Sequence, residues 1–360
     1  MKKKFSILLL MFSCMFMIFA GGEKEAVADD GVLDVALLIN GNLGDKSFHD
    51  SANNGMKLIE SELDAKTKVI EVGYDQSKWE PALRDLCDEG HDIVICGTWQ
   101  MQEIVTNIAP EYPEQKFIVY DTSMDYANDS EGAYDGVYSI EYKQNDGSFL
   151  AGVLAASMSE TGSIGFVGGM DNTVILDFLV GYIQGAQSVN PDIKVIPSFV
   201  GNFSDAAKAK ELTFAQYQMG VDIVFACASN ATDGVLQASK ERGNLCIGVD
   251  SDMAMLYKDS DPELANLIIS SVLKRVDKSL LISAEEAVAG TLAYGSAVGL
   301  GINEDCVGLA DNEIYQAQVP SNVRELVNAY TDQIKNGEIE VVTAFGKSKA
   351  EIDEFIETAR

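Results

Sequence analysis

The sequence predicts an α/β protein in which two doubly wound units follow one another along the chain. Apolar, strand-like runs alternate with segments whose apolar residues recur at helical spacing, and this alternation occurs twice. A β-α-β-α order requires a parallel sheet with helices on both faces. The length of 360 residues also exceeds what one hydrophobic core usually supports. We therefore expect two α/β lobes with a ligand cleft between them.

The first unit begins with Val32–Ile39, a continuous apolar run that stops at a polar, Gly-containing turn, as a buried strand does. After this turn, Ala52, Met56 and Ile59 fall on one face of a helix, which predicts a helix over Ser51–Leu63. The same patterns predict the rest of this unit: strand Val69–Val72, helix Pro81–Glu89, strand Asp92–Cys96, helix Met101–Ala109 and strand Phe117–Tyr120.

The second unit follows the acidic, Gly-containing stretch Asp129–Gly136. Its predicted elements are helix Ser148–Met158, strand Gly162–Val167, helix Val174–Gln187, strand Lys194–Val200, helix Asp205–Met219, strand Asp222–Ala226, helix Thr232–Arg242, strand Leu245–Val249, strand Asn266–Leu273, helix Asp277–Ala289 and helix Ser321–Lys335. Segments near Tyr138–Tyr142 and Ser270–Lys274 have the character of crossings between the two lobes.

The charge of the chain excludes one large class of partner. There are 26 Lys and Arg residues against 56 Asp and Glu residues, which gives a formal net charge of −30. Binding to a phosphate backbone needs clustered Lys and Arg side chains. We therefore expect no nucleic acid partner.

The N-terminus has the three parts of an export signal. A basic start is followed by the short apolar run Phe5–Phe19 and by small residues from Ala20 onward. This pattern predicts a signal peptide over residues 1–20 and a flexible tether over residues 21–31. Cys14 offers an alternative as a lipidated cysteine, although Ser13 and Met11 before it make only a loose lipobox. Both alternatives place the protein outside the cytoplasmic membrane, in a periplasm or on the membrane surface, with a lipid anchor as the only membrane contact.

The remaining cysteines do not suggest a disulfide framework or a metal site. They are odd in number and show no Cys-x-x-Cys spacing: Cys87, Cys96, Cys227, Cys246 and Cys306. With only His49 and His91 in the chain, a zinc site lacks ligands at credible spacing. We expect buried thiols, no metal and no cofactor.

The residues after the predicted strands are the candidates for ligand contact, because ligands of open α/β sheets bind beyond the carboxyl ends of the strands. These residues carry carboxylates, amides and aromatic rings: Asn40 and Asp45, Trp99, Asp121, Gly168–Asp171, Phe203, Ser229 and Asn230, and Asp250. They include no phosphate-binding loop with a Lys.

One segment is specific enough to suggest a family. Gly44–Ala52 reads GDKSFHDSA and resembles the DKSFN signature of the basic membrane protein family. Six further blocks agree with the family in the same order: Pro113–Asp121, Gly147–Leu154, Gly162–Asp171, Val221–Ala228, Gly248–Asp252 and Ser270–Asp277. The resemblance covers essentially the whole chain after the predicted signal. It implies an extracytoplasmic lipoprotein that serves as a purine nucleoside receptor for an ABC importer, with permease and ATPase subunits as its partners.

The resemblance also implies a type I periplasmic-binding-protein fold with two α/β lobes joined by crossover segments. The lobes are then discontinuous in sequence. Lobe 1 would hold residues 32–140 and about 275–315, and lobe 2 would hold residues 141–274 and about 316–360.

In such a family member, the base of the nucleoside stacks between two aromatic rings. Phe48 matches the first ring and Phe203 is similar to the second. Asp121 resembles the acid at the base edge, and Asp250 with Lys274 resembles the pair at the ribose, where Lys274 would also hold Asp250 in place.

Simpler interpretations remain beside these roles. Phe203 is alternatively a core residue, Asp121 a turn cap and Lys274 a solvated charge at a helix start. Trp99 would either stack on the ligand or wedge between the lobes. His49 stands where the family usually has Asn, and Asn40 stands near the position that often carries an acid, so base preference stays open.

Three other function classes are alternatives to a nucleoside receptor. A sugar- or autoinducer-type binding protein of the same fold is the main alternative, because aromatic rings and carboxylates also bind pyranoses. A hydrolase would have to use Asp45, Asp121 and Asp250, but no Gly-x-Ser-x-Gly, Walker or His-Glu-x-x-His motif is present. A repressor would open with a basic helix-turn-helix, which is missing. We expect a binding protein without catalytic residues.

Overall fold

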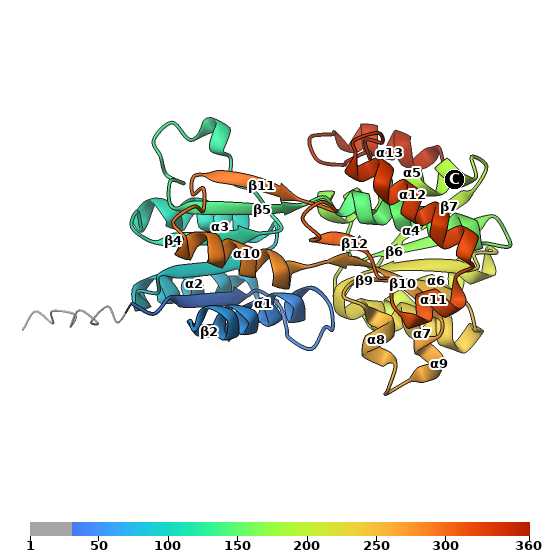
Figure 1. Ribbon diagram of the computed structural model, residues 1–360, viewed down its shortest axis with the longest axis horizontal. Coiled ribbons are helices and arrows are strands. Elements are labelled where there is room, and N and C mark those ends of the chain that lie inside the picture. The colour runs from blue at the N-terminus through green and yellow to red at the C-terminus, as the bar shows by residue number, and fades with distance from the viewer. Residues whose placement is uncertain (1–30) are drawn as a thin grey trace, which may run out of the picture. The chain divides into compact units, whose positions relative to one another are not determined.

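Two six-stranded sheets organise the chain in the computed structural model, which describes residues 31–360 (Figure 1). The predicted signal peptide over 1–20, nearly all of the tether over 21–31, and the possible lipid site at Cys14 lie outside the described residues.

The first sheet is entirely parallel and has the strand order β11-β5-β4-β3-β1-β2. Its strands are β1 (Asp34–Ile39), β2 (Lys66–Glu71), β3 (Ile93–Gly97), β4 (Lys116–Tyr120), β5 (Val137–Tyr142) and β11 (Ser296–Leu300). The central strand β3 is buried at every position, which explains its continuous apolar sequence.

The second sheet repeats this arrangement with the order β12-β10-β9-β8-β6-β7, in which β12 is antiparallel to β10 and the other pairs are parallel. Its strands are β6 (Ser163–Gly168), β7 (Lys194–Phe199), β8 (Ile223–Cys227), β9 (Leu245–Asp250), β10 (Ile268–Lys274) and β12 (Val307–Leu309). The predicted α/β class with two doubly wound lobes is confirmed.

Helices cover both faces of each sheet. On the first sheet, α1 (Phe48–Leu63) and α10 (Val276–Val288) pack on one face, and α2 (Trp79–Glu89) and α3 (Met101–Ile108) pack on the other. The helices around the second sheet are α4 (Gln144–Met158), α5 (Thr173–Val189), α6 (Ala206–Gln218), α7 (Thr232–Arg242), α8 (Met253–Tyr257), α9 (Pro262–Ala265), α11 (Glu313–Gln318), α12 (Ser321–Lys335) and α13 (Lys349–Glu357).

The core of the second unit depends on the close approach of α4 and α5. A Cβ atom at Gly185 would lie 1.9 Å from the carbonyl oxygen of Phe149, and one at Gly152 would lie 2.1 Å from that of Tyr182. Only glycine fits at these two positions, because any side chain would push the helix backbones apart.

The chain passes between the two sheets three times. β5 in the first sheet leads directly to α4, and β10 in the second sheet leads directly to α10, which packs on the first (Figure 1). These two crossings were predicted. The third lies between β11 and β12, earlier in the chain than the return to the second lobe near residue 315 that the expected boundaries imply, and both strands are short and carry little apolar pattern. The segments that join the sheets are also where a hinge between lobes would lie.

Most predicted elements agree with the structure to within a few residues, with two differences near the crossings and the site. α1 begins at Phe48 rather than Ser51, and α4 begins at Gln144 rather than Ser148. The first turn of α4 contains Gln144, Asn145 and Asp146, whose polar side chains conceal the start of a largely buried helix. The short elements α8, α9, α11 and α13 were not predicted.

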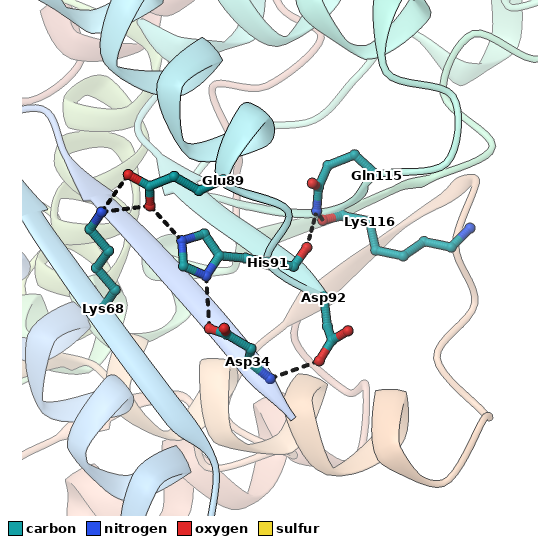
Figure 2. A network of polar contacts seen from close by, with 7 residues as sticks. All are labelled: Asp34, Lys68, Glu89, His91, Asp92, Gln115 and Lys116. Atoms are coloured by element: carbon teal, nitrogen blue, oxygen red, sulfur yellow. Dashed lines mark hydrogen bonds and ion pairs between the residues drawn. The ribbon is translucent and has the colours of Figure 1, made fainter. Parts of the chain in front are cut away.

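A network of polar contacts connects neighbouring elements of the first sheet at the amino ends of its strands (Figure 2). The Nδ1 atom of His91 lies 2.7 Å from Asp34 Oδ1, and its Nε2 atom lies 2.9 Å from Glu89 Oε2. Lys68 on β2 contacts both oxygens of Glu89 at 2.6 and 2.5 Å. The Asp34 backbone N–H donates to Asp92 Oδ2 at 2.8 Å. The network therefore joins β1, β2 and the end of α2.

The cysteines of the described residues are buried and form no disulfide, as predicted. Within residues 31–360, no helix combines the length and the apolar character needed to cross a membrane.

Candidate ligand-binding site

A cavity opens where the carboxyl ends of the two sheets face each other. The space between its walls is about 670 Å³ when the open solvent at the mouth is included. Residues from both lobes line it: Asn40, Phe48, His49, Tyr74, Thr98, Trp99, Gln100, Asp121, Asn172, Val174, Ile175, Phe178, Phe203, Cys227, Ala228, Ser229, Val249, Asp250 and Lys274. Eight of the residues predicted to contact ligand are in this lining: Asn40, Phe48, Trp99, Asp121, Phe203, Ser229, Asp250 and Lys274.

Four non-glycine residues at the strand ends adopt left-handed backbone conformations, and all four line the cavity. Thr98 (φ 74°) and Asp121 (φ 61°) end β3 and β4, and Ser229 (φ 46°) and Asp250 (φ 63°) lie at the ends of β8 and β9. The two pairs occupy equivalent strands of the two sheets. Such conformations cost about 1–3 kcal/mol each and cluster at functional sites. Both sheets therefore carry the same strained pair at this cavity.

The charged groups of the cavity gather around Lys274 at the end of β10. Its ammonium forms an ion pair with Asp121, and both side chains are nearly inaccessible, at 2% and 10% exposed. The Lys274 Nζ atom also lies 5.0 Å from the ring centroid of Tyr142 and 5.5 Å from those of Phe48 and Phe178.

Asp250 has a different partner from the one predicted. Its Oδ2 atom accepts a hydrogen bond from the Ser47 hydroxyl at 2.5 Å. Among the described residues, the carboxylate that contacts Lys274 is that of Asp121, so the prediction that Lys274 holds Asp250 in place is corrected. Asp121 lies on the first sheet and Lys274 on the second. The way in which the two sheets face each other therefore brings the Lys274 ammonium to Asp121 rather than to Asp250.

Burial shifts the titration of both acids. It raises the pKa of Asp250 to about 7, against the opposing effects of Lys274 and the Ser47 hydrogen bond. It also raises the pKa of Asp121, although the Lys274 ammonium counteracts the rise. The two buried carboxyl groups provide acceptors for hydroxyl or ring N–H groups of a ligand. The ammonium of Lys274 provides a donor for a ligand oxygen or nitrogen.

The two phenylalanines come from opposite lobes. Phe48, 9% exposed, stands in the first turn of α1, and its ring centroid lies 5.5 Å from that of Tyr120. Phe203 follows β7 and lies against the backbone of Gly169, where a Cβ atom would be 2.3 Å from the Phe203 ring. Phe203 also packs against the core of its lobe, so it serves both as a lining residue and as a packing residue. Trp99 lines the cavity and is 42% exposed.

Comparison with known proteins identifies the family of this chain. Residues 32–342 match the model of the Bmp family, described as ABC transporter substrate-binding protein PnrA-like. The chain belongs to the Bmp family. It is therefore of the ABC transporter substrate-binding type, a family of binding proteins rather than enzymes, and proteins of this kind act outside the cytoplasm.

Several characterised proteins resemble this Bmp-family chain over most of its length. It is 30% identical to the ABC transporter nucleoside-binding protein BmpA of Lactococcus lactis subsp. cremoris, over 89% of this chain and 92% of the relative. It is also 30% identical to Basic membrane protein D of Borreliella burgdorferi, over 95% of both chains.

Solved structures support the fold of this Bmp-family chain. A solute-binding protein of an ABC transporter system from Aeropyrum pernix K1 is 26% identical and covers 90% of this chain and 96% of its own length, with a TM-score of 0.77. An ABC transporter periplasmic solute-binding protein from Actinobacillus succinogenes with bound D-allose is similar in fold alone, at 14% identity and a TM-score of 0.60 over 79% of this chain and 99% of its own. The type I periplasmic-binding-protein fold is thus confirmed.

Some predicted contact residues of this Bmp-family chain lie outside the cavity lining, namely Asp45, Asn230 and the segment Gly168–Asp171. Asp45 accepts hydrogen bonds from the backbone N–H groups of Ser47, His49 and Asp50, each at 3.0 Å, and from the Ser229 hydroxyl at 3.1 Å. Asn230 donates to the Tyr74 hydroxyl at 3.2 Å. Both residues therefore join the two sides of the cleft, and direct ligand contact by either of them stays a prediction.

Several lining residues were not predicted. Thr98 and Gln100 flank Trp99 just after β3. They could have been predicted, because they also follow the carboxyl end of a strand. Val174, Ile175 and Phe178 lie on α5 and look like core residues in the sequence.

His49 was not predicted as a site residue, although it lines the cavity. It is 5% exposed, and its Nδ1 atom has no hydrogen-bond partner in the described part of the chain. Burial lowers the pKa of His49 despite the opposing charges of Asp45 and Asp50, which favours a neutral imidazole in the wall of the cavity.

Proposed function

We propose that this protein binds a purine nucleoside between its two lobes and delivers it to an ABC permease. The observation that carries the proposal is the composition of one cavity: rings from both lobes, Phe48 and Phe203, share it with Asp121, Asp250 and Lys274. Aromatic side chains bury the flat face of a base, and such stacking contributes about 1–3 kcal/mol per base.

The charged groups suit the two ends of a nucleoside. Asp250 accepts hydrogen bonds from ribose hydroxyls, Asp121 faces ring N–H groups, and Lys274 donates to a ligand oxygen beside its ion pair. The name of the Lactococcus lactis relative, a nucleoside-binding protein, supports this choice of ligand.

A sugar- or autoinducer-type ligand is the second candidate. It is favoured by the D-allose held in a protein of the same fold, and aromatic rings beside carboxylates also suit a pyranose. The two candidates differ in one respect: a nucleoside carries an aromatic base that contributes to binding affinity, and a sugar carries none.

Calorimetric titration with inosine, guanosine, adenosine, uridine and ribose separates the candidates. We expect the purine nucleosides to bind most tightly and ribose to bind at least a hundredfold more weakly. Tighter binding of ribose than of any nucleoside would replace the proposal by the sugar alternative. Chemical conversion of the bound nucleoside would contradict a transport role.

Delivery is tested separately, by measuring the uptake of labelled inosine in cells that lack this protein. We expect uptake to fall and to return on complementation. Closure of the lobes on the ligand predicts a smaller radius of gyration at saturating nucleoside in small-angle scattering. An unchanged radius would contradict closure.

We further propose that the mature protein lacks residues 1–20 or carries lipid on Cys14. Intact-mass measurement of protein from the native envelope distinguishes the two forms. A full-length cytosolic product would contradict both.

A further inference from the structure

We propose that Lys46, Tyr257 and Asp233 form a clasp across the mouth of the cleft that slows the release of any bound ligand. This inference rests on the proposed binding of a ligand between the lobes, but it does not depend on which ligand is bound. The three residues lie outside the cavity lining, so the clasp acts on the lobes and not on the ligand.

A chain of polar contacts connects the clasp residues. The Lys46 ammonium donates to the Tyr257 hydroxyl oxygen at 3.3 Å, and the Tyr257 hydroxyl donates to Asp233 Oδ1 at 2.6 Å. The Lys46 Nζ atom also lies 4.0 Å from Asp233 Oδ2 and 5.1 Å from the centre of the Tyr257 ring. Donors and acceptors aligned in series strengthen one another.

These contacts cross from one lobe to the other. Lys46 belongs to the loop between β1 and α1, which packs on the first sheet. Asp233 stands in the first turn of α7 and Tyr257 ends α8, and both helices pack beside the second sheet. Opening the lobes must therefore break the Lys46 contacts, whereas the Tyr257–Asp233 hydrogen bond stays within one lobe.

The loop holds Lys46 in a fixed and strained conformation. Lys46 is left-handed, at φ 53°, although it is not a glycine. Its backbone N–H donates to Asp50 Oδ2 at 2.9 Å, and the N–H of Gly44 donates to the other oxygen at 2.8 Å. Backbone strain of this kind persists only where the surroundings impose it, and it is found at functional positions. The loop thus directs the Lys46 side chain toward the other lobe before any ligand binds.

The energetic effect of the clasp should appear in the equilibrium between open and closed forms. Lys46 and Asp233 are 42% and 47% exposed, and an ion pair that is this exposed adds little to the stability of a single rigid body. Here the pair exists only in the closed form, so its whole contribution shifts the closed population. Since most affinity changes appear in the dissociation rate, we expect dissociation to accelerate by about two- to tenfold when the clasp is removed.

The test compares Lys46→Met, Tyr257→Phe and the double variant with the full-length wild type in stopped-flow dissociation of inosine, guanosine and ribose. We expect each variant to release every ligand that the wild type binds about two- to tenfold faster, with little change in association rate. Lys46→Arg keeps the charge and should stay close to wild type.

Lys240→Met is the matched control. Lys240 also forms an ion pair, 2.7 Å from Asp261 Oδ2, with partly exposed side chains (34% and 30%), but both partners belong to the second lobe. The Lys240→Met variant should release each ligand at the same rate as the wild type. Equal rates for Lys46→Met and Lys240→Met, or an acceleration that differs from one ligand to another, would overturn the clasp.

The clasp and the proposed function fail in different ways. If the wild type binds ribose and no nucleoside, the proposed function fails and the ribose rates still decide the clasp. If it binds none of the three, small-angle scattering without ligand decides: a larger radius of gyration for the Lys46→Met/Tyr257→Phe variant than for Lys240→Met supports the clasp, and equal radii overturn it.

Discussion

Lys274 at the end of β10 forms a buried ion pair with Asp121 at the end of β4, so one charged contact joins the two sheets at the base of the cavity. The residues are 153 positions apart in the sequence. Asp250 lies in the same cavity, and the ammonium of Lys274 also opposes the rise that burial causes in the pKa of its carboxyl group.

Replacing Lys274 by Met should therefore destabilise the protein and abolish ligand binding. Removing one member of a buried pair leaves an uncompensated charge, which costs about 3–5 kcal/mol. Urea unfolding measures the loss, and calorimetry measures binding. The double variant Lys274→Met/Asp121→Asn should recover part of the stability but not the binding. A Lys274→Met protein as stable as the wild type would contradict the importance of this pair.

The two ends of the proposed nucleoside should respond to different substitutions. Phe48→Leu and Phe203→Leu keep an apolar side chain but remove a stacking face worth about 1–3 kcal/mol, so each should weaken nucleoside binding by roughly 5- to 150-fold. The free purine base should lose affinity to a similar degree. Calorimetry with inosine and hypoxanthine measures both effects, and Phe345→Leu, outside the lining, is the control.

Asp250→Asn should affect the nucleoside and spare the free base. The amide keeps the shape but removes a charged acceptor for ribose hydroxyls, with an expected loss of about 1.5–3 kcal/mol. If Asp250→Asn and Phe48→Leu both leave inosine affinity within twofold of wild type, the assignment of this site is wrong.

The raised pKa of Asp250 predicts a stability that falls with increasing pH. Between about pH 4 and pH 7, folded Asp250 retains a proton that the unfolded chain has already released, because the pKa of an unfolded Asp is about 3.9. The folded state then binds more protons, so stability decreases as pH rises through this window. Urea unfolding at pH 5, 6, 7 and 8 should show a steeper decline for the wild type than for Asp250→Asn.

The same titration predicts the opposite trend for binding. Ribose hydroxyls donate best to an ionised carboxylate, so nucleoside affinity should rise between about pH 6 and pH 8 in the wild type. The rise should be absent in Asp250→Asn. Parallel pH profiles for the two proteins would show that Asp250 does not titrate in the site.

The His91 network should contribute to stability without affecting the ligand. His91→Ala removes both ring contacts, to Asp34 and Glu89, and should lower the unfolding free energy by about 1–2 kcal/mol. Nucleoside affinity should stay within twofold, because the network lies at the amino ends of strands whose carboxyl ends face the cavity. A change in affinity comparable to that of Phe48→Leu would indicate that the two edges of the sheet are coupled.

Local patterns in the sequence were sufficient to predict most strands of the two sheets and part of the cavity lining. The apolar runs of β1, β3 and β8 are buried along nearly their whole length, and such strands are recognisable from composition alone. Parallel strands also bring their carboxyl ends to one edge. Asn40, Trp99, Asp121 and Asp250 could therefore be selected without knowledge of the structure.

The sequence alone thus determined the α/β class, the repeated unit and the strand-end candidates, because these depend on periodicities of a few residues. Only the tertiary structure decided that Lys274 pairs with Asp121 rather than Asp250 and that Val174 and Phe178 line the cavity. It also gave Lys46 its partners in the other lobe. These contacts depend on how two separately wound sheets approach each other, and residues far apart in the chain carry no local pattern that encodes this approach.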